Sequence, residues 1–212
     1  EHIPRAFTKQ RDTKSSNVHG PTESTTCATA HQIDRANPAP TGSVPIGRPI
    51  AHTTLRVLDA NMQPVPIGVR GQLWIGGDGL ARGYLNQPQL SDERFVCDPL
   101  ASAPDARLYR SGDEVRWLPE GTIEFLGRGD DQVKTHGFRI EPGEIEARLN
   151  QHADVASSTV VAQALRGDKR LVAYVVPRTG EAIETQKLDA WLRMKLPAFM
   201  VPAVFVMLDA LP

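Results

Sequence analysis

Short apolar runs, separated by glycine, proline and other turn residues, follow one another over residues 40–129. The clearest runs cover residues 44–50, 53–58 and 72–75, and the last is closed by Gly76-Gly77. Short strands at regular spacing with turn signals between them are typical of a small β-barrel or sandwich. The pattern therefore predicts that this region is mainly β.

Two polar stretches near these runs predict helical structure. Residues 1–16 are polar and basic, which favours a surface helix and loop. Further along, Ser91 precedes Asp92 and Glu93, and a serine followed by acids is typical of a helix N-cap and first turn.

After residue 129 the pattern changes to an alternation of strands and helices. Residues 132–135 and 138–140 predict a short hairpin. Pro142 suits the first position of a helix, and Ile145 and Leu149 give that helix an apolar face. The remaining predicted elements are strands over 157–162, 170–176 and 203–208 and a second helix that begins at Thr185 and is ended by Pro197. Together they predict a small α+β domain over residues 130–212.

Glycines and charged residues crowd the joint between the two regions, over residues 127–146. Such a joint is either a solvated linker or a working hinge, and the residue types alone leave both possibilities open. The fold class expected from the whole pattern is α+β in two parts.

Composition narrows the possible functions. The 212 residues are 40% hydrophobic and 23% charged with a net charge of −1, which gives no electrostatic argument for nucleic acid or an anionic membrane. No apolar run approaches the ~20 residues of a membrane span, so a cytoplasmic location is expected. Cys27 and Cys97 suggest neither a disulfide framework nor a cysteine metal site. Because the chain starts at Glu1 and stops just after a strand-like run, it is expected to be an excerpt from a longer protein.

A first candidate site lies at Thr22 and Glu23, which follow the turn signal Gly20-Pro21. A hydroxyl beside a carboxylate on a tight loop can contact a phosphate and hold its Mg²⁺, since hard cations prefer oxygen ligands. The alternative is a turn in which the threonine only caps the backbone. These residues alone do not decide between the two.

A second candidate is Asp113, which follows Gly112 and is predicted to lead into a strand over 114–118. A carboxylate at a sheet edge can accept hydrogen bonds from two adjacent ribose hydroxyls. The alternative is an aspartate turn before a hairpin. By contrast, residues 76–85 lack the Lys-Ser/Thr of a phosphate loop, and we interpret them as structural.

Five ordered motifs resemble those of the adenylation domains of non-ribosomal peptide synthetases, within the adenylate-forming, AMP-binding superfamily. They are residues 17–23, 72–85, 108–113, 127–141 and 196–202, so the likeness spans the chain after residue 16. The resemblance implies that residues 1–129 are the incomplete end of an adenylate-forming large domain, including its small β-barrel subdomain. It also implies that residues 130–212 are a small α+β C-terminal domain, truncated at its end.

The resemblance implies roles for the first motif. Thr22 would contact the nucleotide phosphate and Glu23 would bind Mg²⁺. His19 would border the adenine, where the family has tyrosine, and Gly20 belongs to the same nucleotide-binding signature. Lining the amino-acid side-chain pocket would be Val18, Thr26 and Cys27, whose mostly uncharged character suggests a substrate without a strong charge.

The later motifs supply the other implied roles. Asp113 would hold the ribose diol, and Arg128 would contact the ribose and neighbouring groups. The small domain would rotate between two catalytic poses about Asp130, the hinge. Lys134 would face the active site in the second, thioester-forming pose.

The implied reaction has two halves. An amino acid and ATP give aminoacyl-AMP and pyrophosphate, and the phosphopantetheine thiol of a peptidyl carrier domain then displaces AMP. A condensation domain of the same synthetase would be a neighbour. Residues 1–212 contain neither the family's Ser/Thr/Gly-rich phosphate loop nor its Asn-Gly-Lys lysine. Because both supply positive charge where the reaction needs it, the chain alone is expected to be inactive.

Four departures from the family pattern keep alternatives open: His19, Glu114, Gly129 and His136. We expect Gly129 to loosen the hinge, because glycine removes backbone restriction. One alternative is an acyl- or aryl-CoA ligase of the same superfamily, although residues 132–134 and 138–141 favour the synthetase branch. The other is a non-catalytic docking module of the same fold, supported by His19, Glu114 and His136 and opposed by the motif residues that remain.

Overall fold

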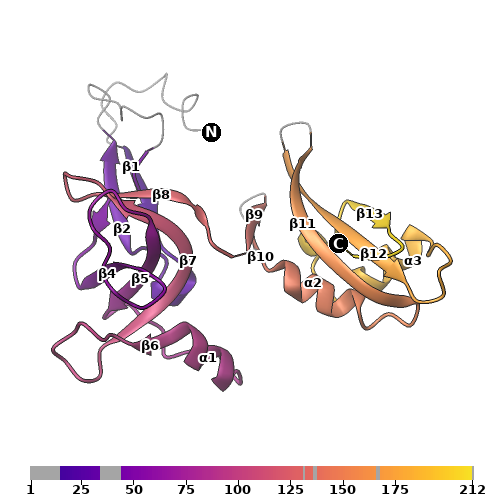
Figure 1. The fold of residues 1–212 in the computed structure, drawn as a ribbon, viewed down its shortest axis with the longest axis horizontal. Helices are drawn as coiled ribbons and strands as arrows, with labels where there is room; N and C mark the ends of the chain where they lie inside the picture. Colours follow the sequence, from indigo (N-terminus) through magenta and orange to yellow (C-terminus); the bar gives the residue numbers. More distant parts are fainter. Residues whose placement is uncertain (1–14, 34–43, 131, 136–137, 166–167, 212) are drawn as a thin grey trace. The chain divides into compact units, whose positions relative to one another are not determined.

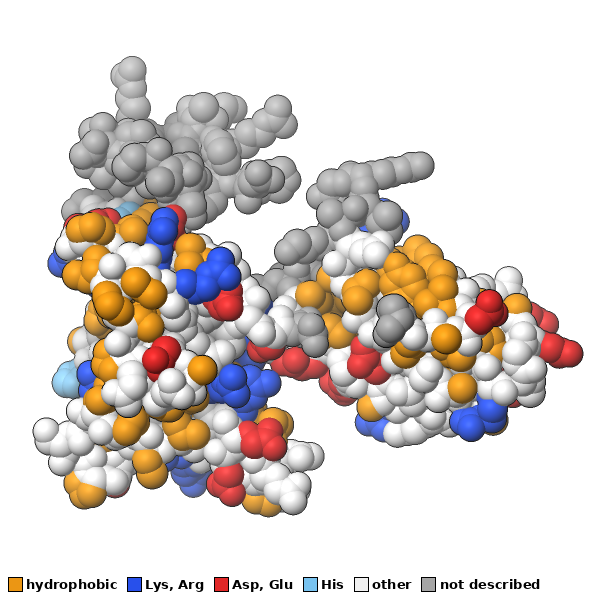
Figure 2. Space-filling model, viewed as in Figure 1, with side chains coloured by type: hydrophobic (Ala, Val, Ile, Leu, Met, Phe, Trp, Pro, Cys, Tyr) orange, Lys and Arg blue, Asp and Glu red, His pale blue; other side chains and the backbone are white. Residues whose placement is uncertain are grey.

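The computed structural model of the chain describes residues 15–33, 44–130, 132–135, 138–165 and 168–211 (Figure 1). The chain divides into two compact units, Glu1–Gly129 and Asp130–Pro212. On the face shown in Figure 2, acidic and basic side chains are interspersed with apolar ones on both units. None of the helices in the described ranges is long and apolar enough to cross a membrane.

A small antiparallel sheet opens the first unit. Its strands are β1 (Ser15–His19), β2 (Thr29–Ile33) and β3 (Arg48–Pro49), in the order β1-β2-β3. Ser15 and Ser16 therefore lie in a strand, and the rest of the helix and loop predicted over 1–16 lies outside the described residues. The strand predicted over 44–50 shrinks to β3, because prolines in this segment cannot donate to a ladder.

A curled five-stranded sheet forms the rest of the first unit's β structure (Figure 1). The order is β4-β5-β7-β6, and β8 also pairs with β7. Its elements are β4 (Thr53–Leu58), β5 (Gly71–Gly77), β6 (Phe95–Cys97), β7 (Arg107–Trp117) and β8 (Ile123–Arg128). Apolar residues of alternating positions pack into one core with the first sheet: Ala28, Ile46, Leu55, Val57, Leu73, Ile75, Val115 and Ile123. The prediction of a mainly β region is confirmed.

The long strand β7 positions Asp113 and pairs with three other strands. β5 pairs along one edge, whereas β6 pairs with the beginning of the other edge and β8 with its end. Register shifts between Glu114 and Val115 and between Gln72 and Trp74 mark irregularities in these ladders. The strand predicted to begin at Glu114 in fact runs from Arg107, so Asp113 lies inside β7, opposite Arg128.

The helix near Ser91 starts earlier than predicted. α1 spans Pro88–Arg94 with Gln87 at its N-cap, so the prediction of Ser91 as the N-cap is wrong. Proline fits the first helical position because its missing N–H has no partner there anyway. The Ser91 hydroxyl instead donates to the carbonyl of Gln87 and accepts the amide of Tyr84, both at 2.8 Å.

The second unit packs helices on a three-stranded sheet of order β11-β12-β13, in which β12 and β13 are parallel. The predicted hairpin and both predicted helices are confirmed, and two strands are longer than expected. The elements are β9 (Val133–Thr135), β10 (Phe138–Ile140), α2 (Pro142–Leu149), β11 (Val155–Leu165), β12 (Asp168–Pro177), α3 (Thr185–Arg193), the 3-10 turn Ala198–Met200 and β13 (Val204–Met207). The buried core includes Ile145 and Leu149 of α2 and Leu188 and Leu192 of α3.

Glu146 ties α2 to the sheet, which gives a stability prediction. Its Oε1 accepts hydrogen bonds from the Val160 amide at 2.7 Å and the Thr159 hydroxyl at 3.0 Å. Hydrogen bonds to a charged group are worth about 1.5–3 kcal/mol, so Glu146→Ala should destabilise the second unit by about 2 kcal/mol. Native-state hydrogen exchange of the β11 amides measures this. The exposed Glu144→Ala, in the first turn of the same helix, should stay within about 0.5 kcal/mol of wild type.

Candidate functional site

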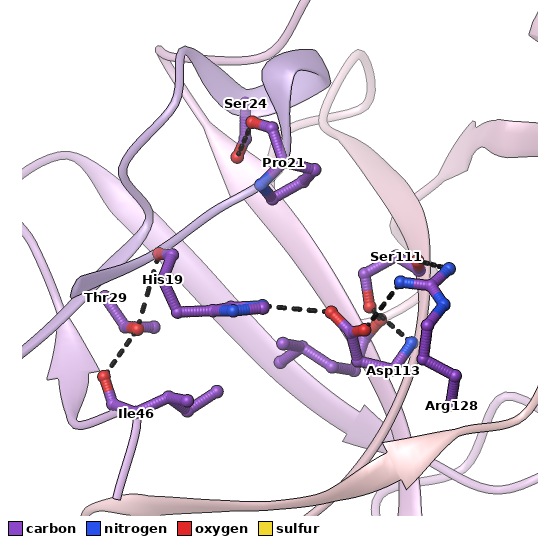
Figure 3. Close-up of polar contacts among 9 residues, drawn as sticks. His19, Pro21, Ser24, Thr29, Ile46, Ser111, Asp113 and Arg128 are labelled. Carbon is purple, nitrogen blue, oxygen red and sulfur yellow. Dashed lines mark hydrogen bonds and ion pairs between the residues drawn. The ribbon is translucent and has the colours of Figure 1, made fainter. Parts of the chain in front are cut away.

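The buried carboxylate of Asp113 is the centre of a polar cluster in the first unit (Figure 3). Arg128 Nη1 donates to Asp113 Oδ1 at 2.7 Å, and His19 Nε2 lies 2.9 Å from Oδ2. Pairing of β7 with β8 sets Arg128 opposite Asp113, and His19 comes from the end of β1. Three residues predicted from separate motifs therefore lie together.

The backbone of β7 supports this cluster through Ser111. The Ser111 hydroxyl donates to the carbonyl of Leu73 at 2.7 Å and accepts the Asp113 amide at 3.1 Å. Arg128 Nη2 also donates to the Ser111 carbonyl at 3.0 Å. Asp113 is 4% exposed, and a carboxylate buried to that degree would be costly without partners; these contacts hold it in one place as a hydrogen-bond acceptor.

An aromatic ring beside the cluster was not predicted from the sequence. The rings of His19 and Phe125 have their centroids 6.2 Å apart and are tilted by 39°. Phe125, on β8, is 38% exposed, so it is not a core residue. From the sequence alone, an apolar residue in a strand is expected to be buried in the core. The pairing of β8 with β7 is what places Phe125 beside His19.

Glu23 forms a second polar group with an unpredicted partner. Thr22 and Glu23 lie in a 3-10 turn, Thr22–Ser24, directly after Pro21. The phenol of Tyr84 donates to Glu23 Oε1 at 2.7 Å. Burial, followed by the hydrogen bond to Glu23, raises the pKa of Tyr84 far above its ordinary value. The phenol therefore stays a neutral donor at physiological pH.

The other predicted residues of the first motif lie near the surface. Val18 is 55% exposed on β1, Thr26 is exposed, and Cys27 is half-buried. Thr25 and Thr26 both have positive φ, so the chain turns sharply before β2.

The predicted residues Asp130 and Lys134 belong to the second unit. Asp130 Oδ1 accepts the Gln132 amide at 3.3 Å. Lys134 lies on β9, where its backbone pairs with Arg139. His136 lies outside the described residues.

Gly129 and Glu114, two of the departures, are neighbours. The Gly129 amide donates to the Gly112 carbonyl at 2.9 Å, which extends the β7–β8 pairing. A Cβ at position 129 would approach Glu114 Cγ at 3.3 Å, and Glu114 is itself paired with Arg70 at 3.0 Å. A side chain at position 129 would therefore require the Glu114 side chain to shift by a few tenths of an ångström.

Comparison with known proteins identifies the class to which this arrangement belongs. Residues 1–85 match the family described as AMP-binding enzyme, and residues 144–212 match the AMP-binding enzyme C-terminal domain. The chain belongs to the AMP-binding enzymes.

Within this family, the chain is similar to the adenylation domains of non-ribosomal peptide synthetases. It is 50% identical over 196 residues to malpibaldin synthetase of Mortierella alpina, covering 92% of this chain and 4% of that protein. The structure of NpsA-ThdA, an artificially fused adenylation-PCP di-domain NRPS from Klebsiella oxytoca, aligns with a TM-score of 0.73 and 32% identity, covering 91% of this chain and 37% of that one. The adenylation domain AlmE of Vibrio cholerae, in complex with glycyl-adenosine-5'-phosphate, aligns with a TM-score of 0.79 and 29% identity, covering 94% and 38%. The chain thus spans only a small part of the length of the relatives that it matches.

Proposed function

We propose that the chain is part of an amino-acid-activating adenylation domain, in which the Asp113 cluster holds the ribose of ATP. The observation that carries this proposal is the buried carboxylate of Asp113, fixed between Arg128 and His19. Such a carboxylate can accept hydrogen bonds from the two adjacent hydroxyls of a ribose, as in dinucleotide-binding folds. Arg128, only 15% exposed, places a positive charge beside the same group.

The neighbouring rings suit a purine. His19 and Phe125 present two flat surfaces next to the carboxylate, and aromatic groups pack well in offset or tilted arrangements. The imidazole of His19 serves where the family has a phenol. The contact between His19 and Asp113, 2.9 Å from Nε2 to Oδ2, supports a placement of adenine next to the ribose site.

Thr22 and Glu23 fit a magnesium site. Among the described residues, no cluster of three or more His, Cys, Asp or Glu side chains could hold a metal ion by itself. Mg²⁺, however, is usually bound through one or two carboxylates together with substrate phosphates and water, and the single carboxylate of Glu23 meets that need. When bound, the ion would offset charge on the phosphates, with the Thr22 hydroxyl as a phosphate contact.

For the second half of the reaction, we assign the thioester-forming pose to Lys134 and the hinge to Asp130, on the strength of the motif that contains both. The partners are an amino acid, a carrier domain with its phosphopantetheine arm, and a condensation domain of the same synthetase. Val18, Thr26 and Cys27 line the side-chain pocket and favour a substrate without a strong charge. Both cysteines are free thiols, which agrees with a cytoplasmic protein.

The test is amino-acid-dependent exchange of pyrophosphate into ATP by the full-length protein. We expect exchange with a small set of amino acids and transfer of the activated one to a carrier-bound thiol. Formation of an acyl-CoA product instead would assign the protein to the acyl- or aryl-CoA ligases. If the folded protein showed no exchange with any amino acid or other carboxylic acid tested, the result would favour a docking module and contradict the proposal.

A further inference from the structure

Tyr84 contacts Glu23 across 61 residues of sequence, and no role follows for it from the motif in which it lies. Its phenol donates to Glu23 Oε1 at 2.7 Å, and both residues are half-buried. Because Glu23 carries the proposed magnesium site, whatever fixes the Glu23 side chain bears on metal binding.

Tyr84 is itself held in place by its surroundings. Its amide donates to the hydroxyl of Ser91 at 2.8 Å. Its ring packs edge-on against Phe95, with the centroids 5.7 Å apart, and Phe95 is buried. The donor that Glu23 meets therefore has little freedom to move.

The backbones of the two segments are joined independently of the phenol. The Ala81 amide donates to the Glu23 carbonyl at 2.8 Å, and the Thr25 hydroxyl donates to the Gly79 carbonyl at 2.7 Å. Arg107 then donates to the carbonyls of Ala81 and Arg82, both at 3.0 Å. These bonds fix the turn and the loop, so the additional bond from Tyr84 acts on the orientation of the Glu23 carboxylate.

We propose that Tyr84 is a positioning residue for magnesium: it holds the Glu23 carboxylate in the orientation that binds the ion. This inference rests on the proposed function. A glutamate side chain loses rotamer freedom when it is fixed, and a partner that fixes it beforehand reduces that cost at the moment of binding. Outer-shell partners of metal ligands typically change metal affinity 10- to 100-fold when they are removed.

The test is Tyr84→Phe in the full-length protein, assayed by calorimetric titration with Mg²⁺ in the presence of a non-hydrolysable ATP analogue, where the affinity for Mg²⁺ should fall about tenfold, and by pyrophosphate exchange over a range of Mg²⁺ concentrations. Phenylalanine keeps the ring against Phe95 and removes only the hydroxyl. We expect the Mg²⁺ concentration for half-maximal exchange to rise about tenfold. The maximal rate at saturating Mg²⁺ and the KM for the amino acid should stay within about twofold, because Tyr84 does not touch the reacting atoms in this assignment.

Tyr174→Phe is the matched control. It removes a phenol that accepts a hydrogen bond from Gln163 at 2.8 Å in the second unit, and it should leave the Mg²⁺ requirement unchanged. An unchanged Mg²⁺ requirement in Tyr84→Phe would overturn the inference. A parallel fall in maximal rate and thermal stability with a rise in the KM for the amino acid would overturn it as well. Lack of exchange in the wild-type protein would instead contradict the proposed function itself.

Discussion

Asp113→Ala is expected to lower amino-acid-dependent pyrophosphate exchange of the full-length protein by at least about 100-fold. In the proposed site the variant would lose two hydrogen bonds from the ribose to the carboxylate, each worth about 1.5–3 kcal/mol, and a tenfold change corresponds to about 1.4 kcal/mol. It also deprives Arg128 of its contact at 2.7 Å, which breaks a buried ion pair. We therefore expect a stability loss of up to about 3 kcal/mol in addition.

A matched control separates lost function from lost stability. Asp98 forms another ion pair in the same unit, with Arg56 at 3.3 Å, and its side chain is 4% exposed against 5% for Asp113. Asp98→Ala should cost comparable stability while leaving exchange at saturating ATP close to wild type. Calorimetry with AMP gives a second measurement, in which only Asp113→Ala should lose binding. Unchanged exchange in Asp113→Ala would refute the ribose assignment.

Gly47→Ala is expected to be among the most destabilising single-methyl changes in the first unit. A Cβ at position 47 would lie 2.0 Å from the carbonyl oxygen of Ala30, and Gly47 has a φ of +98°. The same residue joins the small sheet to β8, since the Ile123 amide donates to its carbonyl at 2.8 Å. Because no flexible side chain can move aside, we expect a loss of at least about 3 kcal/mol.

Gly68→Ala isolates the part of this effect that comes from backbone conformation. Gly68 has a φ of +82°, but no atom of the described residues lies within 4 Å of the position of its Cβ. Its replacement should cost only the left-handed penalty of about 1–2 kcal/mol. Unfolding of the first unit in urea, monitored by its susceptibility to proteolysis, compares the stability of the two variants. A Gly47→Ala variant no less stable than Gly68→Ala would contradict the steric argument.

Local signals explain which elements could be predicted. Pro142 at the first position of α2, with Ile145 and Leu149 on one face, carries its own evidence for a helix, and α2 lies where it was expected. The N-cap at Ser91 was predicted from equally local evidence and was wrong, because Pro88 begins α1 earlier. A serine can cap a helix or bond back within one, and residue type does not distinguish the two.

Contacts between distant strands explain what could not be predicted. Asp113 was recognised as a candidate, but its place inside β7 depends on pairing with β8 and on a register shift beside Glu114. Phe125 and Tyr84 have no local feature that marks them, since each becomes relevant only through a partner far away in the chain. The motifs indicated the chemistry, and the pairing of strands supplied its geometry.

The boundary between the two units bears on the construction of chimaeras from two related proteins. It falls between Gly129 and Asp130, immediately after the segment in which Arg128 pairs with Asp113. A chimaera joined at Asp130 would inherit Arg128, Gly129 and their partners Asp113 and Glu114 from one parent. A junction moved upstream into β8 would combine an arginine from one parent with a carboxylate from another, and would also separate Gly129 from the glutamate that lies beside it.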